Sequence, residues 1–140
     1  MYWVWANYFA YDNYDALLDF QKEYVAAMTA DTYGGKTPQE TLDLFVKALR
    51  AGDIDLAAKY FALDDKLSRE KWIVVLNSLK TSNLLSQMAN DISSKSQPDI
   101  KNITGEDDYK FVLYDSNGKV GARINMQFNK YSGVWKIESL

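Results

Sequence analysis

The chain has 140 residues, contains no cysteine and no histidine, and carries a formal net charge of −3 at pH 7. It therefore lacks the groups needed for a disulfide, a thiolate nucleophile, a Cys/His zinc site or a serine–histidine relay. The length fits one domain, and the scattered Lys and Arg disfavour nucleic acid as a partner, because phosphate binding needs clustered positive charge.

The amino-terminal segment is rich in aromatic residues, and the first positive charge is Lys22. It is too short to cross a bilayer, which takes about 20 apolar residues, and it lacks the features of a signal peptide. Trp and Tyr concentrate at membrane–water interfaces, and the non-cytoplasmic flank of a span tends to lack Lys and Arg. One interpretation is that this segment follows an absent membrane anchor, with Met1 added in its place. The alternative is an aromatic-rich helix packed on the domain. The aromatic residues are Tyr2, Trp3, Trp5, Tyr8, Phe9, Tyr11 and Tyr14.

A helix is predicted after this stretch, because apolar residues recur on one helical face. It is expected to end between Thr29 and Thr32, and the Gly-rich residues 31–36 are typical of a linker. Residues 1–36 are thus predicted as an amino-terminal helix with a Gly-Gly linker, and residues 37–140 as the main domain. The residues of this face are Leu17, Phe20, Gln21, Tyr24 and Met28.

Two short helices with a sharp elbow are predicted next. Thr37 is a good N-cap, with Pro38 at the first helical position and Glu40 completing a capping box. Gly52 tolerates the left-handed conformation that ends many helices, and Asp53 can cap the helix that follows. All the polar residues of this hairpin have structural roles, so it indicates a scaffold rather than a catalytic site.

Two further helical segments are indicated before the spacing of the apolar residues changes from that of a helix to that of a strand. The residues that share the face of the first are Trp72, Val75, Leu76 and Leu79. After a break at residues 81–83, the second is marked by Leu84, Leu85, Met88 and Ile92.

The remainder alternates with the period of two that is typical of strands. Ile100 and Ile103 are assigned to a first, weakly patterned strand, and residues 109–114 to a second. An Asn-Gly hairpin turn leads to a third strand over residues 120–129, and the last strand covers residues 134–140. The predicted fold class is α+β, with helices packed on a curved antiparallel sheet of three to four strands.

These residues resemble the nuclear transport factor two-like superfamily, in particular small bacterial extracytoplasmic members, which are often membrane-anchored. The resemblance covers residues 37–140 and rests on the helix pair and on a terminal Gly133-Val-Trp-Lys-Ile137 strand. It implies a cone-like fold with a pocket, but its motifs are structural and say little about chemistry. The segment after the second helix departs from the superfamily pattern, because it is predicted to be helical where many members carry a strand hairpin.

Two sets of residues are candidates for binding. An apolar set is predicted to line a pocket in the cone, with a structural role in the core as the alternative: Tyr60, Trp72, Phe111, Ile124, Met126 and Trp135. A polar set on one face of the third strand is a candidate protein-contact surface, with an ordinary solvated face as the alternative: Arg123, Asn125, Gln127 and Asn129.

No catalytic residue, metal site or cofactor is assigned. The acidic run Glu106-Asp107-Asp108 is interpreted as a solvated turn, and Asp64 and Asp65 as loop or capping residues. The leading expectation is a noncatalytic binding or protein-interaction domain, extracytoplasmic and membrane-anchored in its full-length form, with a cytoplasmic location as the alternative. The expected partner is an unknown protein or a small apolar ligand. Two other functions stay open: a lyase or isomerase of the ketosteroid isomerase or scytalone dehydratase type using a buried Asp and a Tyr, and a self-association module, including a homodimer.

Overall fold

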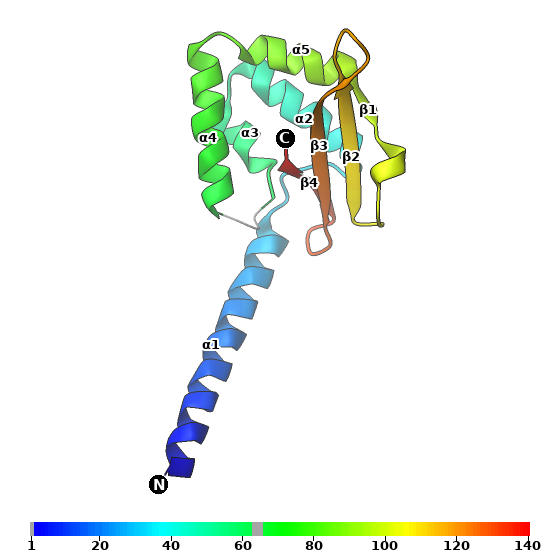
Figure 1. Cartoon of the computed structure of the whole chain (residues 1–140). Helices are drawn as coiled ribbons and strands as arrows, with labels where there is room; N and C mark the ends of the chain where they lie inside the picture. The colour runs from blue at the N-terminus through cyan, green and yellow to red at the C-terminus, as the bar shows by residue number, and fades with distance from the viewer. Residues whose placement is uncertain (1, 63–65) are drawn as a thin grey trace. The chain divides into compact units, whose positions relative to one another are not determined.

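A computed structural model describes the backbone of residues 2–62 and 66–140 and the side chains of residues 16–62 and 69–140. The expectations for Asp64 and Asp65 lie outside the described residues. In chain order the elements are α1 (Tyr2–Ala30), α2 (Pro38–Ala51), α3 (Ile54–Lys59), α4 (Lys66–Thr81), α5 (Leu85–Lys95), β1 (Ser96–Pro98), the 3-10 helix η1 (Ile100–Asn102), β2 (Asp108–Tyr114), β3 (Val120–Asn129) and β4 (Val134–Ser139). Helices followed by an antiparallel sheet confirm the predicted α+β class (Figure 1).

The chain divides into two compact units, Met1–Asp31 and Thr32–Leu140. Helix α1 runs through the aromatic stretch and ends at Ala30, inside the predicted range. Among the residues that the structure describes, no helix combines the length and the apolar character needed to cross a membrane.

The predicted elbow is confirmed. The Thr37 hydroxyl accepts a hydrogen bond from the Glu40 amide at 3.1 Å, and the Glu40 carboxylate accepts one from the Lys36 amide at 2.9 Å. Gly52 ends α2 with φ of 70°, and the Asp53 carboxylate accepts a hydrogen bond from the Leu56 amide. Each contact spans only a few residues, which is why the sequence alone predicts them.

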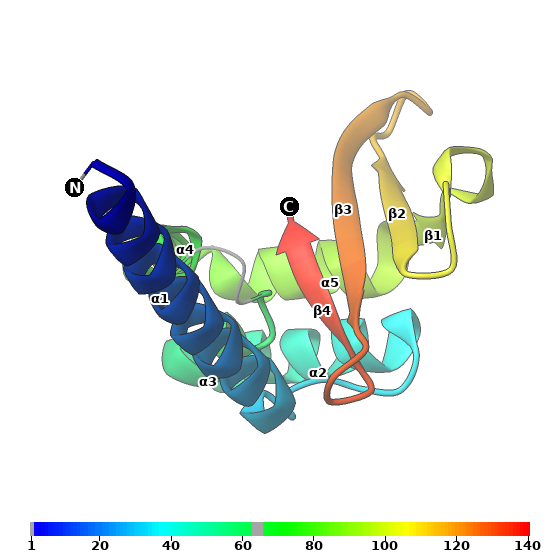
Figure 2. The same ribbon diagram turned by 90° about the horizontal axis from the view of Figure 1, so that it is seen from below.

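The four described strands pair in the order β1-β2-β3-β4, all antiparallel. Helix α2 contacts β4, and α5 contacts β2 and also α2, so both helices pack on the sheet (Figure 2). The outer edge of β4 is covered, because Trp135 donates its amide hydrogen to the Gly35 carbonyl at 2.9 Å and Ile137 donates to the Tyr60 carbonyl at 2.8 Å. This covering removes an edge that could otherwise pair with another strand.

The prediction of a strand containing Ile100 and Ile103 is wrong. Strand β1 covers Ser96–Pro98, and Ile100 lies in η1 with 77% of its surface exposed. The Asp99 amide still donates to the Lys110 carbonyl of β2, but the Asn102 amide then turns back to the Asp99 carbonyl. The 3-10 helix therefore leaves the Ile100 side chain exposed, where a paired strand was expected to bury it.

The prediction that Asn129 lies on a solvated strand face is also wrong, because this residue is buried. Its side-chain oxygen accepts a hydrogen bond from the Tyr131 amide at 3.0 Å, and its carbonyl accepts one from Gly133 at 2.8 Å. Asn129 therefore organises the turn between β3 and β4.

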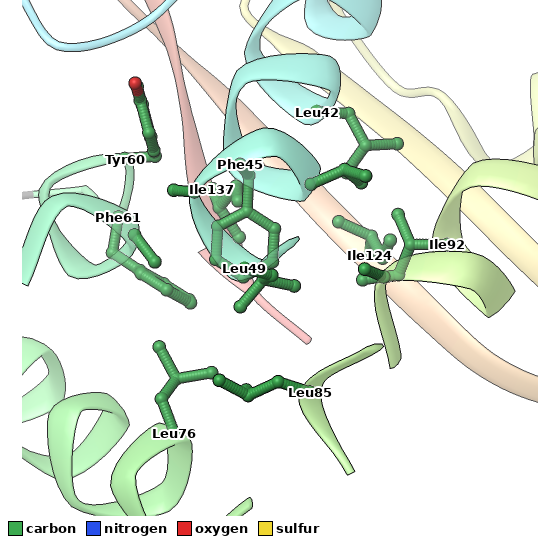
Figure 3. Packing of buried hydrophobic residues seen from close by; sticks show 14 of the residues in the cluster. Leu42, Phe45, Leu49, Tyr60, Phe61, Leu76, Leu85, Ile92, Ile124 and Ile137 are labelled. Carbon is green, nitrogen blue, oxygen red and sulfur yellow. The ribbon is translucent and has the colours of Figure 1, made fainter. Parts of the chain in front are cut away.

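The core lies between α2 and the helices around it on one side and the inner face of β2–β4 on the other. Phe45 of α2 is fully buried in this core. Its ring meets the ring of Phe61 edge-to-face, with 5.6 Å between the ring centroids (Figure 3). Phe61 in turn stacks on Trp72 at 5.2 Å. These aromatic contacts join α2 and α4 to the segment that covers β4.

Candidate functional site

An open pocket of about 430 Å³ lies between α5 and the inner face of the β2–β3 hairpin. A pocket of this volume falls within the range that binds small molecules. Most of its lining is apolar, with a few polar residues. The lining residues are Leu79, Leu84, Gln87, Met88, Asp91, Ile92, Leu113, Ala122, Arg123, Ile124 and Leu140.

The helical wall of the pocket follows from the turn between α4 and α5. Asn83 adopts a left-handed conformation with φ of 59°, which Asn tolerates better than most residues. The turn lets the Leu84 amide donate to the Leu79 carbonyl at 2.9 Å, so both leucines lie at the same end of the pocket. Met88 and Ile92 follow at helical spacing on α5 and continue the apolar wall.

The sheet wall follows from the pairing of β2 with β3. Leu113 pairs with Ala122, and Phe111 pairs with Ile124, so these residues share the inner face. Ile124 is buried, whereas Ala122 is exposed. The small Ala122 side chain leaves space that a larger residue would fill.

Three polar residues, Gln87, Asp91 and Arg123, belong to the lining of the pocket. The Asp91 carboxylate forms an ion pair with the Lys95 ammonium at 3.3 Å, one helical turn away. Arg123 stands between Ala122 and Ile124 on β3, so the alternation of a strand directs its side chain to the opposite face. The lining as a whole is mostly apolar, which favours an uncharged group as the occupant.

The structure brings one of the six predicted pocket residues, Ile124, to this pocket. Phe111 and Met126 are fully buried in the core, and Tyr60 is buried there as well. Trp72 and Trp135 are half-buried and pack against the core. The sequence indicates the helical wall as an apolar face but gives no signal that this face borders open space.

The Tyr60 hydroxyl has a raised pKa. Burial raises its pKa above 10.0, and the neighbouring Tyr33 and Asp53 raise it further. The hydroxyl therefore keeps its proton at neutral pH. Tyr60 is absent from the lining of the pocket, so the structure does not join it to Asp91 in a shared space.

Three of the four residues predicted as an interaction surface, Arg123, Asn125 and Gln127, occupy alternate positions on the outer face of β3. Arg123 is exposed, whereas Asn125 and Gln127 are half-buried. The Asn125 side chain donates a hydrogen bond to the Ser139 hydroxyl at 2.7 Å, so it also links β3 to the end of β4. Arg123 is the most accessible of the three.

A second hollow of about 370 Å³ lies beside this surface and is acidic. Its lining residues are Thr104, Gly105, Glu106, Asp107, Asp108, Met126, Gln127 and Glu138. Asp108 accepts hydrogen bonds from the Thr104 amide and hydroxyl, both at 3.0 Å, and pairs with Lys110 at 3.2 Å. Over the described ranges, no group of three or more acidic side chains is arranged to hold a metal ion.

Replacing Asp108 with asparagine is expected to weaken the dependence of stability on acid pH. The Thr104 amide hydrogen bond, the Thr104 hydroxyl and Lys110 together hold the pKa of Asp108 below 3.8. A lowered pKa in the folded state stabilises the protein above the unfolded value, and that contribution is lost as pH falls through the folded value. Urea unfolding of both proteins from neutral to acid pH measures the difference, and Thr104→Ala should give an intermediate result. An identical pH dependence in Asp108→Asn would contradict this assignment.

Comparison of the chain with protein-family models, with curated proteins and with solved structures finds no match in any of the three.

Proposed function

We propose that this protein is a noncatalytic binding domain that takes a small apolar ligand in the pocket between α5 and the β2–β3 hairpin. The observation that carries the proposal is the pocket itself, a hollow of about 430 Å³ with a mostly apolar wall. The ligand is an uncharged apolar group, such as a short alkyl chain, because a charged group facing Ala122 and Ile124 would lose its hydration without a partner.

The geometry favours binding over lyase or isomerase chemistry. Such chemistry needs a carboxylate and a proton donor directed at a shared space. Asp91, the one carboxylate side chain in the lining, is ion-paired with Lys95, and no tyrosine lines the pocket. The buried Tyr60 lies elsewhere in the core.

The arrangement of helices over an antiparallel sheet is also consistent with a cone-like fold of the nuclear transport factor two-like kind. The expected extracytoplasmic, membrane-anchored setting is part of the same proposal. It is supported by the aromatic segment ahead of Lys22, which contains no Lys or Arg. In that setting the main unit presents its pocket to ligands outside the membrane.

Titration of methyl-labelled protein with decan-1-ol tests the proposal by nuclear magnetic resonance. Saturable shifts are expected for the methyl groups of Met88, Leu113 and Ile124, which line the pocket. Replacing Ala122 with tryptophan should fill the space and abolish these shifts, while the core stays folded because Ala122 is exposed.

Ala51→Trp is the matched control, because Ala51 is exposed on α2 and is absent from the pocket lining. This variant should bind decan-1-ol as the unchanged protein does. Shifts that fail to saturate, or that survive in Ala122→Trp, would refute the pocket as the binding site.

A further inference from the structure

Strand β3 is longer than its neighbour β4, so part of one edge of β3 is unpaired. The register places Asn125 opposite Ser139, the last residue of β4. Among the described residues, no strand pairs with residues 120–124 on that side, and Figure 2 shows β3 continuing past the tip of β4. An unpaired edge offers backbone donors and acceptors to an added strand.

The backbone groups of Arg123 face this open edge. The Phe128 amide donates to the Asp107 carbonyl at 3.0 Å, so the backbone groups of Phe128 are directed toward the β2 side. Successive residues of a strand in an antiparallel sheet direct these groups to alternate sides. Arg123 is an odd number of positions from Phe128. Its N–H and C=O are therefore directed toward the β4 side, beyond the last pair of that ladder.

The proposed ligand pocket borders the same edge. Its lining includes Ala122 and Ile124, which flank Arg123, and also Leu140, which follows β4. On a strand added here, the residue opposite Arg123 would direct its side chain to the outer face, and the two residues beside it would direct theirs inward. An added strand could therefore pair with β3 and present apolar side chains to the pocket.

Arg123 determines which side chain suits the outer face. It is exposed, and within the described ranges its guanidinium forms no ion pair. A carboxylate directly opposite it on an added strand would make a cross-strand pair, an arrangement that stabilises antiparallel sheets. The edge thus favours a segment in which one acidic residue stands between two apolar residues.

We propose that a short extended segment of a partner protein, with an apolar–acidic–apolar sequence, adds to β3 beside Arg123. The inference rests on the proposed function, because the apolar group in the pocket is then a side chain of this segment. Main-chain hydrogen bonds give such strand addition its affinity, and pockets for alternate side chains give it specificity. The register shift between Leu113 and Tyr114 keeps the regular edge short, so only a few residues pair.

Titration of isotopically labelled protein with the peptide acetyl-Thr-Val-Glu-Leu-Thr-amide tests the proposal by nuclear magnetic resonance. Saturable shifts are expected for the Arg123 amide and for the methyl groups of Leu113 and Ile124, which line the pocket. N-methylation of the peptide's glutamate should abolish binding, because that N–H donates to the Arg123 carbonyl. N-methylation of the peptide's valine is the matched control and should preserve binding, since this N–H faces away from β3.

Charge reversal at residue 123 tests the acidic position. Arg123→Glu should weaken binding of the glutamate peptide about fivefold and should favour the same peptide with lysine in place of glutamate. Lys101→Glu makes the same change of charge at an exposed residue of η1 that is absent from the pocket lining. This control should bind both peptides as the unchanged protein does.

Decan-1-ol separates this inference from the proposed function. A glutamate peptide that displaces decan-1-ol would support both. Binding of decan-1-ol without binding of the peptide would overturn the inference and leave the proposed function standing. Peptide binding that survives N-methylation of the glutamate, or that is indifferent to the charge at residue 123, would overturn the inference as well.

Discussion

Replacing Phe45 with alanine is expected to lower the free energy of unfolding by about 3–5 kcal/mol, the range for deletion of a buried aromatic side chain. Phe45 is fully buried, and its ring makes an edge-to-face contact with Phe61. The cavity would open where α2 meets the segment that covers β4, and Phe61 is itself held against Trp72. The surrounding rings cannot collapse fully into the space, so the cost should lie well above that of a surface change.

Leu44→Ala is the control for this prediction, because the neighbouring Leu44 side chain is exposed. It should change the free energy of unfolding by no more than about 0.5 kcal/mol. Urea unfolding of the three proteins by tryptophan fluorescence measures both values. Equal effects at the two positions would mean that α2 does not bury the face containing Phe45.

The parts of the fold that could be predicted from the sequence are those with short-range causes. The caps at Thr37 and Asp53 and the turn at Gly52 depend on residues within one helical turn. The Asn-Gly hairpin and the alternation of β3 are local in the same sense. Their patterns therefore indicate both the type of element and the face that it buries.

The candidate site depends on long-range pairing and could not be predicted in the same way. Ala122 borders a pocket only because the β2–β3 register sets it opposite Leu113, and because α5 supplies Met88 to the same lining. The sequence favours large apolar residues such as Phe111 and Met126 as the lining of a pocket. Both are instead fully buried in the core, where their side chains fill the space. A small residue beside large ones carries no local signal of open space.

The burial of Lys136 likewise could not be predicted from the local sequence pattern. In the Gly-x-Trp-Lys-Ile strand it occupies a position on the outer face of the sheet, where a lysine is normally solvated. Here it is buried, and its ammonium donates hydrogen bonds to the Tyr33 carbonyl, at 2.6 Å, and to the Lys59 carbonyl. These two acceptors lie far away in the sequence, in the linker before α2 and at the end of α3.

Replacing Lys136 with methionine is expected to destabilise the main unit strongly. The aliphatic stem keeps its packing, but the Tyr33 and Lys59 carbonyls lose the donor that satisfies them. A fully buried carbonyl left without a donor costs about 1–3 kcal/mol. These two hydrogen bonds are partly buried, so the cost at each should lie toward the lower end of that range. The substitution also has a stabilising effect, because moving the lysine ammonium out of water costs free energy and methionine carries no charge. The loss of two hydrogen bonds should outweigh this gain, since the one ammonium donates to two carbonyls.

Lys47→Met provides the comparison, because Lys47 is exposed on α2. Lysine and methionine have about equal helix propensity, so this change should not disturb the helix. Chemical unfolding should show a large loss for Lys136→Met and little change for Lys47→Met. Hydrogen exchange should localise the loss, with faster exchange of the amides of Trp135 and Ile137, which bond to the linker and to the end of α3. A Lys136→Met protein that is as stable as the original would reverse the conclusion. The buried ammonium would then be a net cost to the fold, and its retention would need a reason other than stability.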